Sequence, residues 1–417
     1  MIKIKNFFNG NNNILDSNAK VYVCGPTTYD YPHIGNLRPL ITFDVLNRLL
    51  SENGKINYVH NITDIDDKII NKALETNQSE KEVSEYFYKK YLEYMEQLNV
   101  LTPNEMPKVS EHIPGMVSFV KELIEKGFAY ESNGSVYFSV KKDESYGKLA
   151  NLSLSDMMSE EENPDKKDKN DFALWKATDK GIQFETPWGL GRPGWHTECA
   201  YFIKEFFGDE GIDLHGGGID LKFPHHINEM TQYKALTGNE LSKNWSYVGH
   251  LSFDGDKMSK SLGNTISVEK FIDEHSANTL RMLMYSTHYS KPLSINNDTI
   301  SNAQNVVDKI FNSLKKAILN LSEEEIKFLT PEKDEKFVEI IYNDIDITNA
   351  ITHIFTKVKN INENVDTLEN AKKLIYSIDK LGLKLNINEE NLSHYKKHIS
   401  EKNYEEADKL REGILSW

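Results

Sequence analysis

Residues 20–50 read KVYVCGPTTYDYPHIGNLRPLITFDVLNRLL, and this stretch decides the fold class. Its first six residues are typical of a β-strand, a turn-rich connection follows, and apolar residues then recur at helical spacing until Gly54. Residues 56–64 (INYVHNITD) indicate a second strand, and residues 64–75 indicate the start of another helix. Strands that alternate with helices predict an α/β fold with a parallel sheet of the Rossmann type.

Two regions depart from this alternation. Residues 102–190 combine a helical pattern, a hairpin with Asn133-Gly134 as a type I′ turn, and a polar loop at 157–171. After about residue 300 the pattern is all-helical, and one stripe contains Val306, Val307, Ile310, Phe311, Leu314 and Ile318. We therefore expect a Rossmann domain in two halves, 1–101 and 191–300, an inserted subdomain at 102–190, and a helical bundle at 301–417.

The composition is that of a globular protein, with 39% hydrophobic and 27% charged residues among 417. The sequence contains no apolar run long enough to span a membrane, and its N-terminus lacks the apolar run of a signal peptide. These features predict a cytoplasmic protein without a membrane partner. The net charge of −15 disfavours binding of nucleic acid by bulk charge, so an RNA partner would need a local basic surface.

Residues 223–230, FPHHINEM, contain side chains of the kinds that bind metals. On a helix, His225 and Glu229 would share a face, and His226 is three residues from the same carboxylate. The only two cysteines, Cys24 and Cys199, would complete a set of four ligands suited to zinc. The plainer interpretation is a satisfied core histidine with two buried thiols. Spacing alone favours this plainer interpretation, because the chain has no CxxC pair.

Two short motifs suit phosphate groups. HIGN, residues 33–36, lies at a predicted helix start, where backbone amides and the helix dipole favour anions. KMSKSLGN, residues 257–264, contains the ammonium groups of Lys257 and Lys260 on a loop that suits pyrophosphate. Each motif alone also fits a chance match or a solvated loop. Their occurrence together, in this order and on these elements, favours nucleotide binding.

These motifs belong to longer stretches that resemble a known family: VYVCGPTTYDYPHIGN, NITDIDDKI, GRPGWHTECA, DLHGGGIDLKFPHHINE and DKMSKSLGN. They are similar to the class I aminoacyl-tRNA synthetases, and specifically to the cysteinyl-tRNA synthetase family. The similarity spans most of residues 20–300 and continues more loosely through NDIDITNAI and YEEADKLRE. It implies an enzyme that uses ATP to activate cysteine as an adenylate and transfers it to the terminal adenosine of the cysteine tRNA.

The resemblance also assigns roles to residues at matching positions. It implies a single zinc ion per chain, held by Cys24, Cys199, His225 and Glu229. It implies that ATP, together with Mg²⁺, contacts His33, Gly35, Asn36, Lys257 and Lys260. Among these five, the residues expected to act in catalysis are His33, Asn36, Lys257 and Lys260. The amino-acid pocket would be lined by Gly25, Thr63, Trp195, His215 and Asp220. The helical bundle would bind the tRNA, and we expect a monomer.

A zinc ion would explain how such a site separates cysteine from serine. Hydrophobic contacts rarely discriminate near-isosteres by more than roughly a hundredfold, whereas a soft thiolate binds zinc far better than a hydroxyl does. This interpretation agrees with the lack of a recognisable editing domain. Four protein ligands are typical of a closed structural site. We therefore hypothesise that the substrate sulfur becomes a fifth ligand or that Glu229 leaves.

The sequence departs from the family pattern at three places. Asn36 stands where the family has His, which predicts weaker stabilisation of phosphate by this side chain. Ile227 stands where the family often has Glu. The sequence also ends at Trp417, where longer relatives continue.

Two alternatives remain at this stage. One is a cysteine ligase that shares the adenylating domain but joins cysteine to an amino sugar. The other is a non-catalytic synthetase-like protein that binds tRNA or zinc. The complete ligand set and the intact KMSKS motif favour an enzyme over a binding protein.

Overall fold

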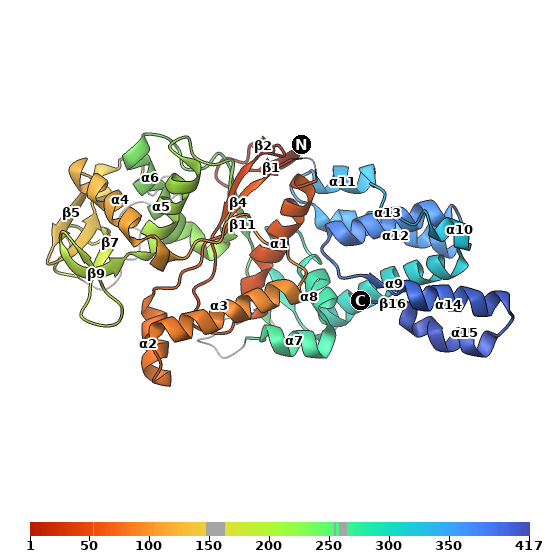
Figure 1. Ribbon diagram of the computed structural model, residues 1–417. Coiled ribbons are helices and arrows are strands. Elements are labelled where there is room, and N and C mark those ends of the chain that lie inside the picture. The colour runs from red at the N-terminus through yellow and green to blue at the C-terminus, as the bar shows by residue number, and fades with distance from the viewer. Residues whose placement is uncertain (53, 147–162, 254–255, 258–264) are drawn as a thin grey trace.

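A computed structural model describes residues 1–417 except 53, 147–162, 254–255 and 258–264. Figure 1 shows an elongated molecule with a parallel sheet near its middle, a small β-rich region at one end and a group of helices at the other. Among the described residues, no helix combines the length and the apolar character needed to cross a membrane.

The central sheet has four parallel strands in the order β11-β10-β3-β4. These are β3 (Lys20–Val23), β4 (Asn57–Val59), β10 (Leu214–Gly218) and β11 (Trp245–Val248). Helix α1 (Ile34–Leu50) connects β3 to β4. The predicted α/β fold with a parallel sheet is confirmed, although both expected strands are shorter than their sequence patterns suggested.

Helix α1 is buried on nearly all sides, which explains why its apolar residues are not confined to one stripe. Its Phe43 packs against Gly216 in the middle of β10. A Cβ atom added to Gly216 would lie 2.4 Å from the Phe43 ring, so the ring occupies the space that any other residue would need. Glycine at this position therefore lets α1 lie close to the sheet.

The region between the two halves of the parallel sheet contains a five-stranded antiparallel sheet in the order β5-β6-β7-β9-β8. Asn133 and Gly134 have φ angles of 48° and 78°, and Ser132 pairs with Ser135, which confirms the predicted two-residue hairpin. The predicted polar loop at 157–171 lies partly outside the described residues. The strands are β5 (Ala129–Ser132), β6 (Ser135–Phe138), β7 (Phe172–Ala177), β8 (Phe184–Thr186) and β9 (Gly189–Pro193).

Further helices lie in the part of the chain before residue 297. They are α2 (Asp67–Thr76), α3 (Glu80–Gln97), α4 (Ile113–Glu125), α5 (Trp195–Phe207), α6 (Ile227–Thr237), α7 (Val268–His275) and α8 (Ala277–Met284). Short strands accompany them: β1 (Ile2–Lys5), β2 (Asn12–Leu15), β12 (Leu251–Phe253), β13 (Asp256–Lys257) and β14 (Leu293–Ile295).

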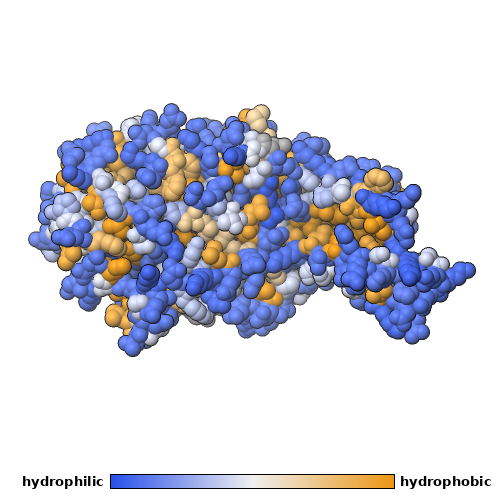
Figure 2. All heavy atoms as spheres, in the orientation of Figure 1, coloured by the Kyte–Doolittle hydropathy of each residue, from blue (hydrophilic) through white to orange (hydrophobic). Residues whose placement is uncertain are grey.

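The C-terminal region is helical, as the sequence predicts. Of the predicted apolar stripe on α9 (Asn297–Asn320), five residues are buried and Val306 is half-buried. The core of this region is continuous with the residues around α1, although Figure 2 shows apolar side chains also reaching the surface over α12 and α13. The other elements are α10 (Glu323–Ile326), α11 (Glu335–Ile341), α12 (Ile347–Asn362), α13 (Thr367–Lys380), α14 (Glu389–Ser400), α15 (Tyr404–Arg411), β15 (Asn386–Ile387) and β16 (Leu415–Ser416).

The contact between Gly216 and Phe43 generates a prediction about stability. Gly216→Ala places a methyl group in occupied space, so we expect the free energy of unfolding to fall by about 1–3 kcal/mol, as measured by urea denaturation. In the double variant with Phe43→Leu, the smaller side chain leaves room, and the combined loss should be less than the sum of the single losses. Strictly additive losses would contradict this account.

Candidate functional site

A buried cluster of side chains of the kinds that bind metals lies at the carboxyl edge of the central sheet. Cys24 follows the last residue of β3, and its Sγ atom lies 3.8 Å from Sγ of Cys199 and 3.9 Å from Oε1 of Glu229. Nε2 of His225 lies 3.6 Å from Sγ of Cys199 and 2.9 Å from Oε1 of Glu229. The four ligand atoms all lie within 4.8 Å of one another. The structure thus brings together the four residues predicted to hold a metal.

Different elements position these four side chains. Cys199 lies in the second turn of α5 and is buried, while Cys24 is half-buried. Glu229 occupies the first turn of α6, and His225 lies in the irregular segment just before that helix. The predicted four-residue spacing therefore places both side chains together, although His225 is not within α6 itself.

Burial and neighbouring charges shift the pKa values of the cluster residues in different directions. Burial raises the pKa of the Cys199 thiol, but hydrogen bonds with Cys24 and His225 outweigh this effect and bring the pKa to about 6. Burial lowers the pKa of His225, but Glu229 and Cys199 raise it to about 10. Burial raises the pKa of Glu229, yet the surrounding imidazoles, His225 foremost, hold it well below its usual range. Without a metal, the cluster thus favours a Cys199 thiolate beside a protonated His225.

A second set of potential ligands overlaps the first. Nε2 of His226 lies 3.4 Å from Sγ of Cys24, and Nε2 of His215 lies 2.8 Å from Oε2 of Glu229. Cys24, His215, His226 and Glu229 therefore form another group whose ligand atoms lie within 4.8 Å of one another. Nδ1 of His226 is 3.0 Å from the hydroxyl of Tyr247, which restrains its ring. Geometry alone thus permits either histidine of the pair, as the sequence pattern did.

A cavity of about 650 Å³ adjoins the cluster at Cys24. It extends from the end of β3 to the start of α1 and to the turn after β10. Six of the residues predicted to bind substrates or metal line it: Cys24, Gly25, His33, Gly35, Asn36 and Asp220. The cavity therefore connects the HIGN motif with the cluster of thiol, imidazole and carboxylate groups.

The start of α1 has a well-defined cap. Nδ1 of His33 accepts a hydrogen bond from the backbone N–H of Gly35 at 3.1 Å, and Oδ1 of Asn36 accepts one from the N–H of His33 at 3.1 Å. This reciprocal arrangement is a capping box, which fixes the side chains of the motif at the helix N-terminus. A Cβ atom added to Gly35 would lie 2.9 Å from the His33 ring, so glycine leaves space for that ring.

Three of the other predicted pocket residues lie around the cluster rather than on this cavity. Trp195 is 39% exposed and stacks on His225, with ring centroids 4.1 Å apart. Together with His196 it lines a neighbouring cavity of about 1020 Å³. His215 is fully buried behind Glu229. Thr63 is buried beside α5. The cluster is therefore surrounded by predicted substrate residues on several sides.

Sequence reasoning missed two residues that connect Thr63 to the site. The Thr63 hydroxyl donates to Oε2 of the buried Glu198 at 2.6 Å, and Asn61 accepts the backbone N–H of Gly25 at 2.9 Å. Burial raises the pKa of Glu198 well above its usual range, against the lowering effect of the Thr63 hydroxyl. The available signal was position: Glu198 adjoins Cys199, and Asn61 lies in the predicted strand at 56–64 and follows β4.

The second phosphate motif is only partly described. The backbone of Lys257 belongs to β13 and pairs with Ser252 of β12. Lys260, with the rest of residues 258–264, lies outside the described residues. The backbone N–H of Ile34 donates to Ile266 at 3.1 Å, so the segment that follows this motif meets the first one.

Comparisons with known proteins show which family and fold this chain resembles. Residues 11–305 match the family model of the class I (C) tRNA synthetase catalytic domain. The chain is 41% identical to a cysteine–tRNA ligase of Mesoplasma florum, across 97% of this chain and 96% of the relative. It is 37% identical to one from Fusobacterium nucleatum, across 100% and 96%. A methionyl-tRNA synthetase structure from Mycobacterium tuberculosis superposes with a TM-score of 0.62 at 13% identity, covering 91% of each chain.

The buried bond between Thr63 and Glu198 generates a prediction. Thr63→Val keeps the shape but leaves a buried carboxyl oxygen without its donor, so the free energy of unfolding should fall by about 1–3 kcal/mol. Thr63→Ser keeps the hydroxyl and should lose less. Chemical denaturation of both variants gives the comparison, and equal losses would show that the hydroxyl contributes little.

Proposed function

The chain belongs to the cysteine–tRNA ligase family of class I tRNA synthetases, and we propose that its buried thiol–imidazole–carboxylate cluster holds a zinc ion at which cysteine is selected. As a member of this family it joins cysteine to tRNA at the expense of ATP. The observation that carries the proposal is the meeting of the cluster with the cavity that the HIGN motif lines.

The donor set fits zinc. Two thiols, an imidazole and a carboxylate are ligands that zinc accepts together, and such ligands bind in their deprotonated forms. A low pKa at Cys199 and at Glu229 favours those forms. The raised pKa values of His225 and Cys24 mean that zinc would have to displace a proton from each of these two residues. We assign the site to Cys24, Cys199, His225 and Glu229. When bound, zinc would supply a soft Lewis acid that prefers the sulfur of cysteine to the oxygen of serine.

The residues of the first motif are proposed to bind ATP, together with Mg²⁺. The N-terminus of α1 offers backbone N–H groups and the positive end of the helix dipole to phosphate. The capping box holds Asn36 by its carboxamide oxygen, so its NH₂ group is the donor that it can offer to a phosphate oxygen. Gly35 has no Cβ atom, so it would let a phosphate oxygen approach the backbone closely. Lys257 and Lys260 are proposed to neutralise the pyrophosphate as it leaves.

The reaction needs no protein nucleophile. A carboxylate oxygen of cysteine attacks the α-phosphorus of ATP, and the bond to the bridging oxygen breaks to release pyrophosphate. A ribose hydroxyl of the terminal adenosine of tRNA then attacks the carbonyl carbon of the adenylate, and AMP leaves. The proposed catalytic residues, His33, Asn36, Lys257 and Lys260, act by positioning the reactants and stabilising phosphate charge.

The remaining assignments concern the substrates and the assembly. We propose that Gly25, Thr63, Trp195, His215 and Asp220 line the pocket for cysteine. Asp220 lies exposed at the rim of the cavity. We further propose two catalytic halves at 1–101 and 191–300, a connective insertion at 102–190 and a tRNA-binding bundle at 301–417. The proposed location is the cytoplasm, and the proposed state is a monomer.

Aminoacylation tests the function directly. Purified protein with ATP, Mg²⁺, labelled cysteine and total tRNA should charge the cysteine tRNA alone, because the thiol-binding site selects the amino acid. Labelled serine is the matched control and should not be incorporated. Cysteine-dependent pyrophosphate exchange without charged tRNA would instead favour transfer to a small acceptor, and no exchange would contradict an adenylating enzyme.

The metal assignment is tested by comparing the two adjacent histidines. We expect purified protein to contain a single zinc ion per chain, measured by mass spectrometry of the metal. His225→Ala removes a ligand and should weaken zinc binding about tenfold or more. His226→Ala, the neighbouring control, removes a contact to Cys24 but no assigned ligand, so it should weaken zinc binding less than His225→Ala does. The reverse result would assign the ion to the second set, which contains His215 and His226.

A further inference from the structure

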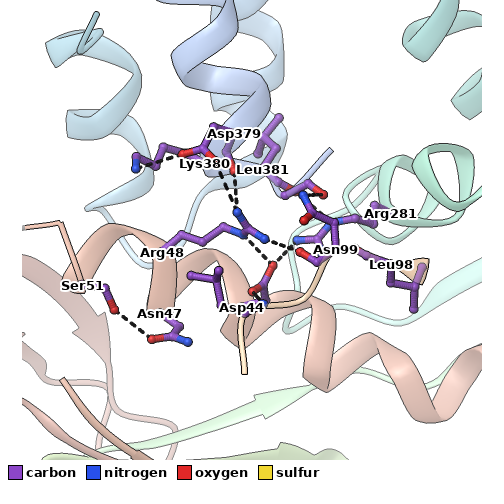
Figure 3. Close-up of polar contacts among 12 residues, drawn as sticks. Asp44, Asn47, Arg48, Ser51, Leu98, Asn99, Arg281, Asp379, Lys380 and Leu381 are labelled. Atoms are coloured by element: carbon purple, nitrogen blue, oxygen red, sulfur yellow. Dashed lines mark hydrogen bonds and ion pairs between the residues drawn. The ribbon is translucent and has the colours of Figure 1, made fainter. Parts of the chain in front are cut away.

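A second buried carboxylate, far from the metal cluster, lies between the catalytic half and the C-terminal helices. The side chain of Asp44, on α1, is fully buried, and its Oδ2 accepts hydrogen bonds from Arg48 at 2.9 Å and from Arg281 of α8 at 2.5 Å. Its Oδ1 accepts the backbone N–H of Leu101 at 2.8 Å. Figure 3 shows both guanidinium groups converging on Asp44. Both arginines are also buried.

The same arginines reach the C-terminal end of α13, as Figure 3 shows. Arg48 donates to the carbonyl oxygen of Asp379 at 3.2 Å, and Arg281 donates to that of Leu381 at 2.9 Å. Asn99, which follows α3, donates to the carbonyl oxygen of Gly382 at 3.1 Å. The last carbonyl groups of a helix have no partner within the helix. Here, side chains from the catalytic half bond to these carbonyl groups, and the carbonyl of Asp379 also accepts the backbone N–H of Gly382 at 2.8 Å.

The C-terminal end of the α13 dipole helps to balance the charges in this contact. Two guanidinium groups face one carboxylate, Asp44, which leaves an excess of positive charge. The C-terminus of α13 offers the negative end of its dipole, equivalent to roughly half an elementary charge. Arg48 also lies 3.5 Å from the half-exposed carboxylate of Asp379. The position of α13 is therefore part of what allows two arginines to be buried.

A buried ionic contact of this kind determines the relative orientation of the two helices more than it increases the free energy of unfolding. Well-packed hydrophobic residues would often stabilise an interface equally well, and the surrounding core is already apolar. Guanidinium groups, however, bond to particular carbonyl oxygens at particular angles. A shift of α13 by one residue would break these bonds, whereas apolar packing would adjust. The contact thus determines the register and rotation of α13 relative to α1.

Helix α1 connects this contact to the nucleotide motif. His33 and Asn36 lie at its start, and Asp44 is eleven residues beyond His33, about 16 Å along the helix. Arg281 lies on α8, which follows the segment that meets the first motif at Ile34. The helices that follow both nucleotide motifs therefore share one fixed contact with the C-terminal region.

We propose that Asp44, Arg48, Asn99 and Arg281 are positioning residues for transfer of cysteine to tRNA, and we call them the Asp44 joint. They hold α13, and with it the helices proposed to bind tRNA, at a fixed orientation to the catalytic half. The proposal rests on the proposed function, because it needs a tRNA that spans both parts. Formation of the adenylate uses only the catalytic half and does not require the joint.

Two variants test the joint by separating the two steps. Asn99 has a left-handed φ of 53°, so Asn99→Gly keeps the backbone unstrained and removes only the bond to Gly382. We expect its kcat/KM for tRNA in aminoacylation to fall about fivefold, which is typical of one lost hydrogen bond. Arg48→Met keeps an apolar stem but loses several bonds, so the fall should be larger. Cysteine-dependent pyrophosphate exchange should change by less than about twofold in both variants.

Asn77→Gly is the matched control. Asn77 also has a φ of 53° and caps the end of α2, outside the joint. It should leave the ratio of aminoacylation to exchange unchanged. A merely structural role predicts that both activities fall together with thermal stability, and an unchanged ratio in Asn99→Gly and Arg48→Met would overturn the proposal. Absence of exchange in the unmodified protein would instead contradict the proposed function itself.

Discussion

Burial of the Glu229 carboxylate is the constraint on which the rest of the site depends. A charged carboxylate away from water is costly unless hydrogen-bond donors and opposite charge surround it. Glu229 is fully buried, and His215 and His225 contact its two oxygens. These partners come from β10 and from the segment before α6. Sheet and helix must therefore pack in one way for Glu229 to remain ionised, and that packing also brings Cys24 and Cys199 together.

The protein buries a second carboxylate, Asp44, with different partners, and the difference follows from chemistry. Arginine remains charged under all ordinary conditions, so Arg48 and Arg281 form a permanent contact. Histidine can lose its proton and present a lone pair to a metal. Burial with imidazoles therefore suits a site that exchanges a proton for an ion. Burial with guanidinium groups suits a contact whose geometry stays constant. Both clusters stabilise a buried carboxylate, but the imidazole groups suit metal binding and the guanidinium groups suit a constant geometry.

Local patterns in the sequence predicted much of the fold and of the candidate site. The strand–turn–helix of residues 20–50 and the Asn133-Gly134 hairpin depend on neighbouring residues, so spacing reveals them. The resemblance to a family supplied the pairing of Cys24 with Cys199, which are 175 residues apart. Contacts such as Arg281 with Asp44, 237 residues apart, have no such local signal. Glu198 and Asn61 were missed although their positions in the sequence offered a signal, because their partners are determined by packing.

Helix α1 unites these observations, because one part of it borders the candidate site and another part carries the second buried carboxylate. Its N-terminus closes the cavity that adjoins Cys24, and its later turns carry Asp44 and Arg48. A helix buried on nearly all sides moves as a rigid body, since interior packing leaves little free space. The packing around α1 would therefore resist a change in the orientation of α13. Under the proposed function, the first reaction step would need only the start of this helix, whereas a substrate that reaches the C-terminal helices would depend on both parts of it.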